Sequence, residues 1–131
     1  MEQMIPGFLE EMLKKQYGEE VFSKILAGYQ ARRPVTLRVN PIKADRNTVE
    51  QALTGAGIAF KDVSWYEDAM IIEGAREPEI QELPIYKEGG IYLQSLSSML
   101  PPLFLDPKAG ESVLDMAAAP GGKTTQMAAM T

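Results

Sequence analysis

The residues best suited to chemistry lie near the end of the sequence, in the run Glu111-Ser-Val-Leu-Asp-Met-Ala-Ala-Ala-Pro-Gly-Gly-Lys-Thr-Thr-Gln-Met127. This run predicts a strand, a tight loop and a helix. Asp115 would lie at the carboxyl end of a buried strand through Val113 and Leu114, where open α/β sheets bind their ligands. The free N–H groups and positive dipole end of the following helix suit an anion such as a carboxylate. We therefore predict a ligand-binding loop.

The residue types inside this loop fit close contact with a ligand. The three alanines at 117–119 are small enough to let a ligand approach the backbone. Gly121 and Gly122 permit a tight turn into the helix, and Pro120 stiffens the loop because its φ is fixed.

Two other interpretations of the loop remain open. Gly122-Lys123-Thr124 matches the end of the phosphate-binding pattern G-x-x-x-x-G-K-[ST], and a nucleotide-binding P-loop fragment would bind ATP with Mg²⁺. The first glycine of that pattern would fall at Ala117, however, and Pro120 removes one of the N–H donors that would wrap a phosphate. A purely structural turn is the other alternative, since glycine pairs also serve simple turns.

The elements upstream of the loop begin with a predicted helical hairpin. Apolar residues recur at the spacing of one helical face from Ile5 to Leu13, and again from Val21 to Tyr29. Gly18 separates the two stretches and is expected to end the first helix.

A small α/β subdomain is expected next. Val35, Leu37 and Val39 alternate with polar residues, which is the period of a half-buried strand whose polar face carries Arg38 and Asn40. The sequence 47–50 resembles a capping box for a short helix that Gly57 closes, and strand-like segments follow at 58–63 and 70–73.

An acidic stretch at 74–90 contains two prolines and no sustained period, so we interpret it as a linker and the subdomain boundary. After it, residues 91–93 are predicted to form a strand. Ser95 is expected to cap a helix that runs towards Phe104.

Composition excludes several kinds of site. The 131 residues contain no cysteine and no histidine, which removes disulfides, thiolate zinc sites and most metal or catalytic-triad chemistry, so no metal is expected. No apolar run approaches the length of a membrane span, and the expected location is the cytoplasm. The net charge is −5, yet residues 32–46 carry five basic residues against one acid. This basic strip could contact phosphate or could be an ordinary solvated edge.

The loop sequence resembles a known family. Asp115-Met-Ala-Ala-Ala-Pro-Gly-Gly-Lys-Thr-Thr-Gln126 closely resembles the first methyltransferase motif of the Sun-type RNA 5-methylcytosine methyltransferases, in particular their small-subunit ribosomal RNA branch. Two upstream segments, Leu37-Arg-Val-Asn-Pro-Ile-Lys43 and Gly90-Ile-Tyr-Leu-Gln-Ser-Leu-Ser-Ser-Met-Leu100, are similar to the family's N-terminal strand pattern and to the segment leading into its catalytic domain.

The resemblance implies an α/β chain with a defined order of parts. A helical hairpin at 1–33 and a small RNA-binding-like α/β subdomain at 34–74 would be joined by the linker 75–90 to the start, at 91–131, of a Rossmann-like methyltransferase domain. The cofactor would be S-adenosylmethionine, in contact with Ala117, Ala118, Ala119, Pro120, Gly121, Gly122 and Lys123. The resemblance implies an RNA partner, ribosomal RNA in this branch, held by the N-terminal subdomain. The candidate contacts come from the basic strip and the polar face of the predicted strand: Arg32, Arg33, Arg38, Asn40 and Lys43.

The resemblance also shows what to expect of activity. Many relatives have cysteine where this chain has Ala117 and an acid where it has Ser95, and neither change should abolish binding by a loop that acts through its backbone. The family's ribose-binding acid and cysteine nucleophile would lie beyond Thr131, so the chain alone should have no catalytic residue and no activity. A stand-alone RNA-binding or adaptor module is the alternative function.

The lone strand at 113–114 has a structural implication. Because a parallel strand needs neighbours, we expect residues beyond about 105 to be poorly ordered or completed by a second copy in a homodimer. Residues 1–73 would then form the stable unit.

Overall fold

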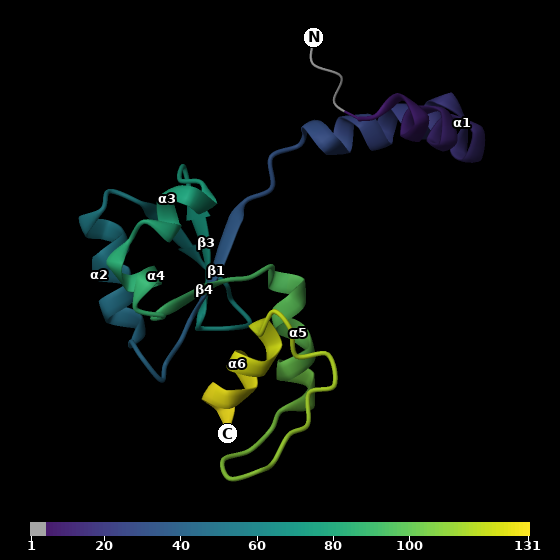
Figure 1. Cartoon of the computed structure of the whole chain (residues 1–131). Coiled ribbons are helices and arrows are strands. Elements are labelled where there is room, and N and C mark those ends of the chain that lie inside the picture. Colours follow the sequence, from purple (N-terminus) through teal and green to yellow (C-terminus); the bar gives the residue numbers. More distant parts are fainter. Residues whose placement is uncertain (1–4) are drawn as a thin grey trace. The chain divides into compact units, whose positions relative to one another are not determined.

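The computed structural model describes residues 5–131 (Figure 1), and the chain divides into two compact units, Met1–Arg33 and Pro34–Thr131. The first unit consists of helix α1 (Gly7–Gln30). Gly18 interrupts it with φ 80° and ψ 167°, values that glycine adopts without steric cost. The predicted break between two helical stretches at Gly18 is therefore confirmed.

The second unit is built on a four-stranded sheet. Its strands are β1 (Val35–Val39), β2 (Ala59–Asp62), β3 (Ala69–Glu73) and β4 (Ile91–Leu93). Their order in the sheet is β2-β3-β1-β4, and every neighbouring pair is antiparallel. The helices between the strands are α2 (Arg46–Gly55), α3 (Glu77–Gln81) and α4 (Pro84–Lys87). This β-α-β-β-α-β arrangement is ferredoxin-like.

Helices cover both faces of the sheet. In Figure 1, α2, α3 and α4 lie on one side of the strands, and α5 (Leu96–Leu105) and α6 (Gly122–Met130) lie on the other. The first face contains the main core, in which Leu37 and Met70 of the sheet pack with Leu53 of α2. On the second face, Ala69 and Ile71 of β3 pack with Met99 of α5. Burial on both faces explains why a short sheet can support a stable unit.

The linker predicted at 74–90 is instead part of this fold. It contains α3 and α4, whose Ile80 and Ile85 are buried in the main core. Gly90 is packed so tightly that an added Cβ would lie 2.6 Å from Ile85 Cδ1. β4, expected to open the next domain, pairs with β1 in the same sheet. The prolines and acidic residues of this stretch lie at helix starts, where both are favoured. Pro78, Glu77 and Glu79 lie in the first turn of α3, and Pro84 begins α4.

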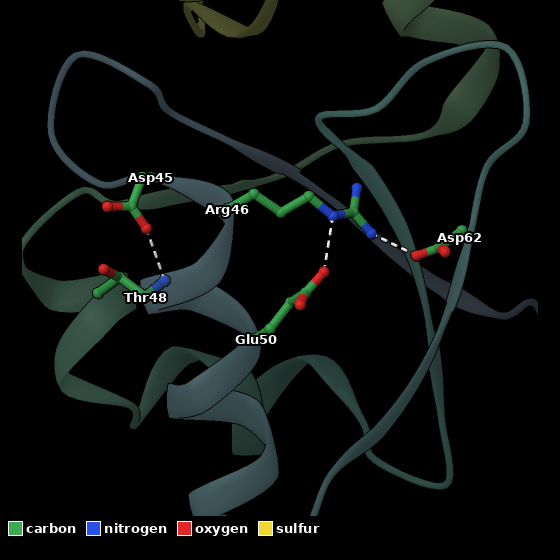
Figure 2. Close-up of polar contacts among 5 residues, drawn as sticks. All are labelled: Asp45, Arg46, Thr48, Glu50 and Asp62. Carbon is green, nitrogen blue, oxygen red and sulfur yellow. Dashed lines mark hydrogen bonds and ion pairs between the residues drawn. The ribbon is translucent and has the colours of Figure 1, made fainter.

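Two helix caps test the capping predictions. Ser95 caps α5 as predicted, with its hydroxyl accepting from the Ser98 N–H. The cap of α2 is Asp45 rather than the predicted Asn47, and its carboxylate accepts from the Thr48 N–H at 2.7 Å (Figure 2). The capping box predicted at 47–50 was wrong because the helix begins two residues earlier, at Arg46.

The strand predicted at Val113 and Leu114 is absent. Residues 111–115 have no regular structure, and the Leu114 side chain is 83% exposed. Within the part of the chain that the structure describes, no strand lies beside them to complete a hydrogen-bond ladder, which a strand requires. The expectation of poor order beyond about residue 105 was wrong for α6, which packs against α5.

Candidate cofactor site and its place in a known family

The predicted loop lines a cleft in the second unit. The cleft has a volume of about 260 Å³, close to the lower end of ligand pockets, which start at about 300 Å³. One wall is the loop and the first turn of α6, and the other comes from the end of β4 and the start of α5. The lining residues are Tyr92, Leu93, Gln94, Ser95, Ser98, Ala117, Ala118, Ala119, Pro120, Gly121, Gly122 and Lys123. All seven residues predicted for the loop are therefore brought together.

The loop closes through Asp115, whose carboxylate holds both ends. One carboxylate oxygen accepts from the Ala117 N–H at 3.0 Å, and the other accepts from the Thr124 hydroxyl at 2.6 Å. The Thr124 hydroxyl, the Ala117 N–H and the nearby Lys123 charge together lower the pKa of Asp115 below its usual range. The sequence predicted Asp115 at the ligand-binding end of a strand. In the structure its carboxylate instead fixes the loop through bonds to Ala117 and Thr124.

The turn into α6 depends on glycine. Gly121 is the residue before the helix and has φ 113°, in the region that side chains with a Cβ rarely adopt. Gly122 faces the opposite wall, where an added Cβ would lie 3.2 Å from Gln94 Nε2 and 3.4 Å from Tyr92 Cε1. Two adjacent positions therefore favour glycine for different reasons, Gly121 for its backbone conformation and Gly122 for the limited space beside Gln94 and Tyr92.

The polar character of the cleft suits an anionic group. The first N–H groups of a helix have no acceptor within the helix, and they carry the positive end of its dipole. In α6 these groups belong to Gly122, Lys123 and Thr124, at the cleft. Opposite them, Gln94, Ser95 and Ser98 supply side-chain amide and hydroxyl groups.

Two of the five basic residues of 32–46, Arg38 and Arg46, are engaged within the second unit. Arg38 is only 1% exposed, and its guanidinium lies on the second face of the sheet under α6. Figure 2 shows that Arg46 is engaged by Glu50 of its own helix and by Asp62 of β2. The exposed basic side chains are those of Arg32 and Arg33 in the first unit and Lys43 in the second.

Asn40 takes part in the fold around Lys43. Its amide nitrogen donates to the Gly89 carbonyl at 2.9 Å, and its side-chain oxygen accepts from the Ile42 N–H at 3.3 Å. These bonds fix the turn after β1 against the residues before β4. The Lys43 side chain is exposed and passes over Gly89.

Two family matches cover most of the chain. Residues 5–78 match the domain described as "Methyltr_RsmF/B-like, ferredoxin-like domain", and residues 102–131 match "16S rRNA methyltransferase RsmB/F". The first match covers more than half of the sequence and agrees with the observed strand order. The chain belongs to the RsmB/F family of ribosomal RNA methyltransferases. The resemblance found in the loop sequence is thereby confirmed.

Relatives of this RsmB/F-family chain include bacterial and eukaryotic enzymes. It is 34% identical to "Ribosomal RNA small subunit methyltransferase B" of Vibrio cholerae, over 93% of the chain and 27% of that protein. It is also 34% identical to "25S rRNA (cytosine-C(5))-methyltransferase nop2" of Schizosaccharomyces pombe, over 94% of the chain and 20% of that protein. The chain thus spans between a fifth and just over a quarter of the length of these relatives.

A solved structure agrees with the fold. A methyltransferase homologue protein from Pyrococcus horikoshii superimposes with a TM-score of 0.69 at 38% identity, over 87% of this chain and 37% of that one. None of the helices described for this chain is long and apolar enough to cross a membrane.

Proposed function

We propose that this chain forms the RNA-contacting and first cofactor-binding part of an S-adenosylmethionine-dependent ribosomal RNA (cytosine-5) methyltransferase. The observation that carries the proposal is the cleft. Residues 117–123, which include the start of α6, form one wall, and Gln94, Ser95 and Ser98 lie on the other. Relatives named as cytosine-C5 methyltransferases of ribosomal RNA support the reaction class.

The residues present fit such a cofactor. Its carboxylate would accept from the free N–H groups at the start of α6, and the small side chains at 117–119 leave the loop backbone open to close contact. Gly122 preserves the width of the cleft, since any larger residue would crowd Gln94 and Tyr92. When bound, the cofactor supplies an electrophilic methyl group on its sulfonium.

The catalytic nucleophile of the proposed reaction is not supplied by these residues. Covalent methylation of a pyrimidine carbon needs a thiolate that adds to the ring, and the sequence contains no cysteine. We therefore expect this chain alone to bind the cofactor without transferring its methyl group.

RNA contacts are proposed at the exposed basic side chains. Arg32 and Arg33 in the first unit and Lys43 in the second would contact phosphates, with Asn40 holding the turn that presents Lys43. Arg38 is not among these proposed contacts because its guanidinium is buried. A homodimer through Val113 and Leu114, and a cytoplasmic location, stay predictions.

The cofactor proposal is tested by calorimetric titration of the chain with S-adenosylmethionine, with ATP and Mg²⁺ as the control ligand. We expect saturable binding of S-adenosylmethionine, its loss in Gly121→Val, and no binding of ATP. Gly55→Ala is the matched control, since Gly55 ends α2 and has open space for a Cβ. ATP binding that Lys123→Ala abolishes would overturn the proposal in favour of a P-loop.

The RNA proposal is tested by fluorescence anisotropy with a ribosomal RNA oligonucleotide at several salt concentrations. We expect Lys43→Glu to weaken binding and to reduce the salt dependence, by a slope of about 1 for each lost phosphate contact. The control is Lys108→Glu, which removes a lysine paired with Asp106. Equal effects of the two variants would contradict a specific contact at Lys43, and RNA binding without cofactor binding would favour a stand-alone RNA-binding module.

A further inference from the structure

Arg38 connects the sheet to both walls of the cleft. Its Nε donates to Gln94 Oε1 at 2.9 Å, which holds a side chain of one wall. Its Nη2 donates to the Gly122 carbonyl at 3.1 Å and to the Thr125 hydroxyl at 2.9 Å, both in the first turn of α6. A single side chain of the ferredoxin-like sheet therefore sets the spacing between two segments that are far apart in the sequence.

The bonds continue from Arg38 into the loop and the opposite wall. The Thr125 hydroxyl donates to the Gly121 carbonyl at 2.7 Å, so Arg38 acts on the glycine with positive φ through one intermediate group. On the other side, Gln94 Nε2 donates to the Ser98 carbonyl at 3.2 Å. Both Gln94 and Ser98 line the cleft.

The surroundings of Arg38 are unusual for a buried charge. Within residues 5–131, no carboxylate lies within ion-pair distance of its guanidinium, and its three acceptors are neutral. Arg38 Cζ lies 5.6 Å from the centroid of the Tyr92 ring, and Nη1 has no hydrogen-bond partner among the described residues. Burial lowers the pKa of Arg38 and is the larger effect, although Asp68 attracts the guanidinium and raises this pKa. Because no carboxylate in the described part of the chain accepts from the guanidinium, its hydrogen bonds are directed to the two walls of the cleft.

We propose that Arg38 is a positioning residue for the cofactor site, fixing the first turn of α6 against Gln94. The inference rests on the proposed cofactor function, because it gives Arg38 an effect on a ligand that it does not touch. The planar guanidinium suits this positioning role, because its Nε donates to Gln94 while its Nη2 donates to α6. A lysine ammonium donates from a single atom and lacks the two separated donors, Nε and Nη2, that reach Gln94 and α6.

The test compares three variants of the whole chain. Arg38→Met keeps much of the apolar stem and removes every donor, and Arg38→Lys keeps the charge and removes the fork. Thr36→Val is the matched control, because the Thr36 hydroxyl on the same strand donates to the backbone carbonyl of Gln94 at 2.6 Å. Thr36→Val removes a part-buried side-chain bond to the same residue and leaves the bonds between Arg38 and α6 in place.

Two measurements are made at a temperature where circular dichroism shows every variant folded. The first is amide hydrogen exchange without ligand, which reports on the order of the turn itself. We expect exchange to be at least about tenfold faster in both Arg38 variants at the first hydrogen-bonded amides of α6, with the sheet unchanged. These are Thr125, whose N–H donates to the Gly121 carbonyl, and Gln126, the next helical amide. The second is calorimetric affinity for S-adenosylmethionine, expected to fall about 10–100-fold, as when groups that orient metal ligands are removed.

The outcomes separate the positioning inference from the proposed function. Unchanged exchange at Thr125 and Gln126 in Arg38→Met, or an equal effect from Thr36→Val, would overturn the positioning inference. Full recovery of affinity in Arg38→Lys would also overturn it, because charge and not the fork would then suffice. Absence of cofactor binding by the unmodified chain would refute the proposed function. Amide exchange, measured without ligand, would still show whether Arg38 orders the first turn of α6.

Discussion

The backbone at Gly121 offers a quantitative test of the loop. A residue held at an unfavourable positive φ costs about 1–3 kcal/mol, and Gly121 has φ 113°. An alanine Cβ there would meet no atom within 4 Å, so crowding adds nothing to this cost. If the loop instead relaxes to relieve the strain, the binding-competent form becomes a minor population and the apparent affinity falls in proportion. A cost of about 1.4 kcal/mol corresponds to a tenfold change.

We therefore expect Gly121→Ala to weaken S-adenosylmethionine binding by about 10–100-fold, or to lower the free energy of unfolding by about 1–3 kcal/mol. The two quantities are measured by calorimetric titration and by urea denaturation followed by circular dichroism. Gly55→Ala in α2 is the control, since it also has open space but no positive φ and should be neutral or stabilising by up to about 1 kcal/mol. A Gly121→Ala chain matching the unmodified chain in both quantities would refute the reasoning.

Three further predictions concern the cap, the loop carboxylate and the packed glycine. Asp45→Ala should lower the free energy of unfolding by about 1 kcal/mol in urea denaturation, whereas Asn47→Ala should leave it nearly unchanged. Because the folded pKa of Asp115 is lowered, its stabilising effect is complete above about pH 5 and is lost as the pH falls through that pKa. Carboxyl NMR titration should show Thr124→Val raising this pKa, and an unchanged pKa would contradict the assigned bond. Gly90→Ala should cost about 1–3 kcal/mol of unfolding free energy by crowding the core, and a neutral effect would show that the neighbours give way.

Local signals in the sequence predicted the parts of the fold that local chemistry decides. Gly18 and Gly57 have positive φ, as their positions at helix ends required. The alternation from Val35 to Val39 predicted β1, whose Leu37 and Val39 are buried in the main core. Ser95 was identified as a cap because its hydroxyl precedes a helical pattern.

The position of Arg38 could not be predicted from alternation alone. Alternation places Arg38 on the face opposite Leu37, and a half-buried strand would leave that face in water. In the structure this second face is covered by α5 and α6, whose start lies more than 50 residues later in the sequence. Nothing in the pattern of β1 distinguishes a solvated arginine from one that donates to Gly122 and Thr125.

The prediction of a strand at Val113 and Leu114 was wrong because it too depended on neighbouring elements that the local sequence does not reveal. Apolar residues of this kind can form a buried parallel strand only when neighbouring strands pair with them. The sheet that the structure describes is antiparallel and ends at β4, and residues 111–115 lie outside it. The turn into α6 was predicted because Gly121 and Gly122 signal it locally, whereas the facing wall of Gln94, Ser95 and Ser98 was not predicted, because only tertiary packing brings it to the loop.

The location of the cofactor is the central claim, and chemical-shift mapping tests it directly. Amide resonances of the nitrogen-15-labelled chain would be recorded during titration with S-adenosylmethionine. We expect the shifts to concentrate at residues 117–123 and at Gln94, Ser95 and Ser98 on the facing wall. Shifts concentrated elsewhere on the chain, or none at saturating cofactor, would contradict the assignment of this cleft.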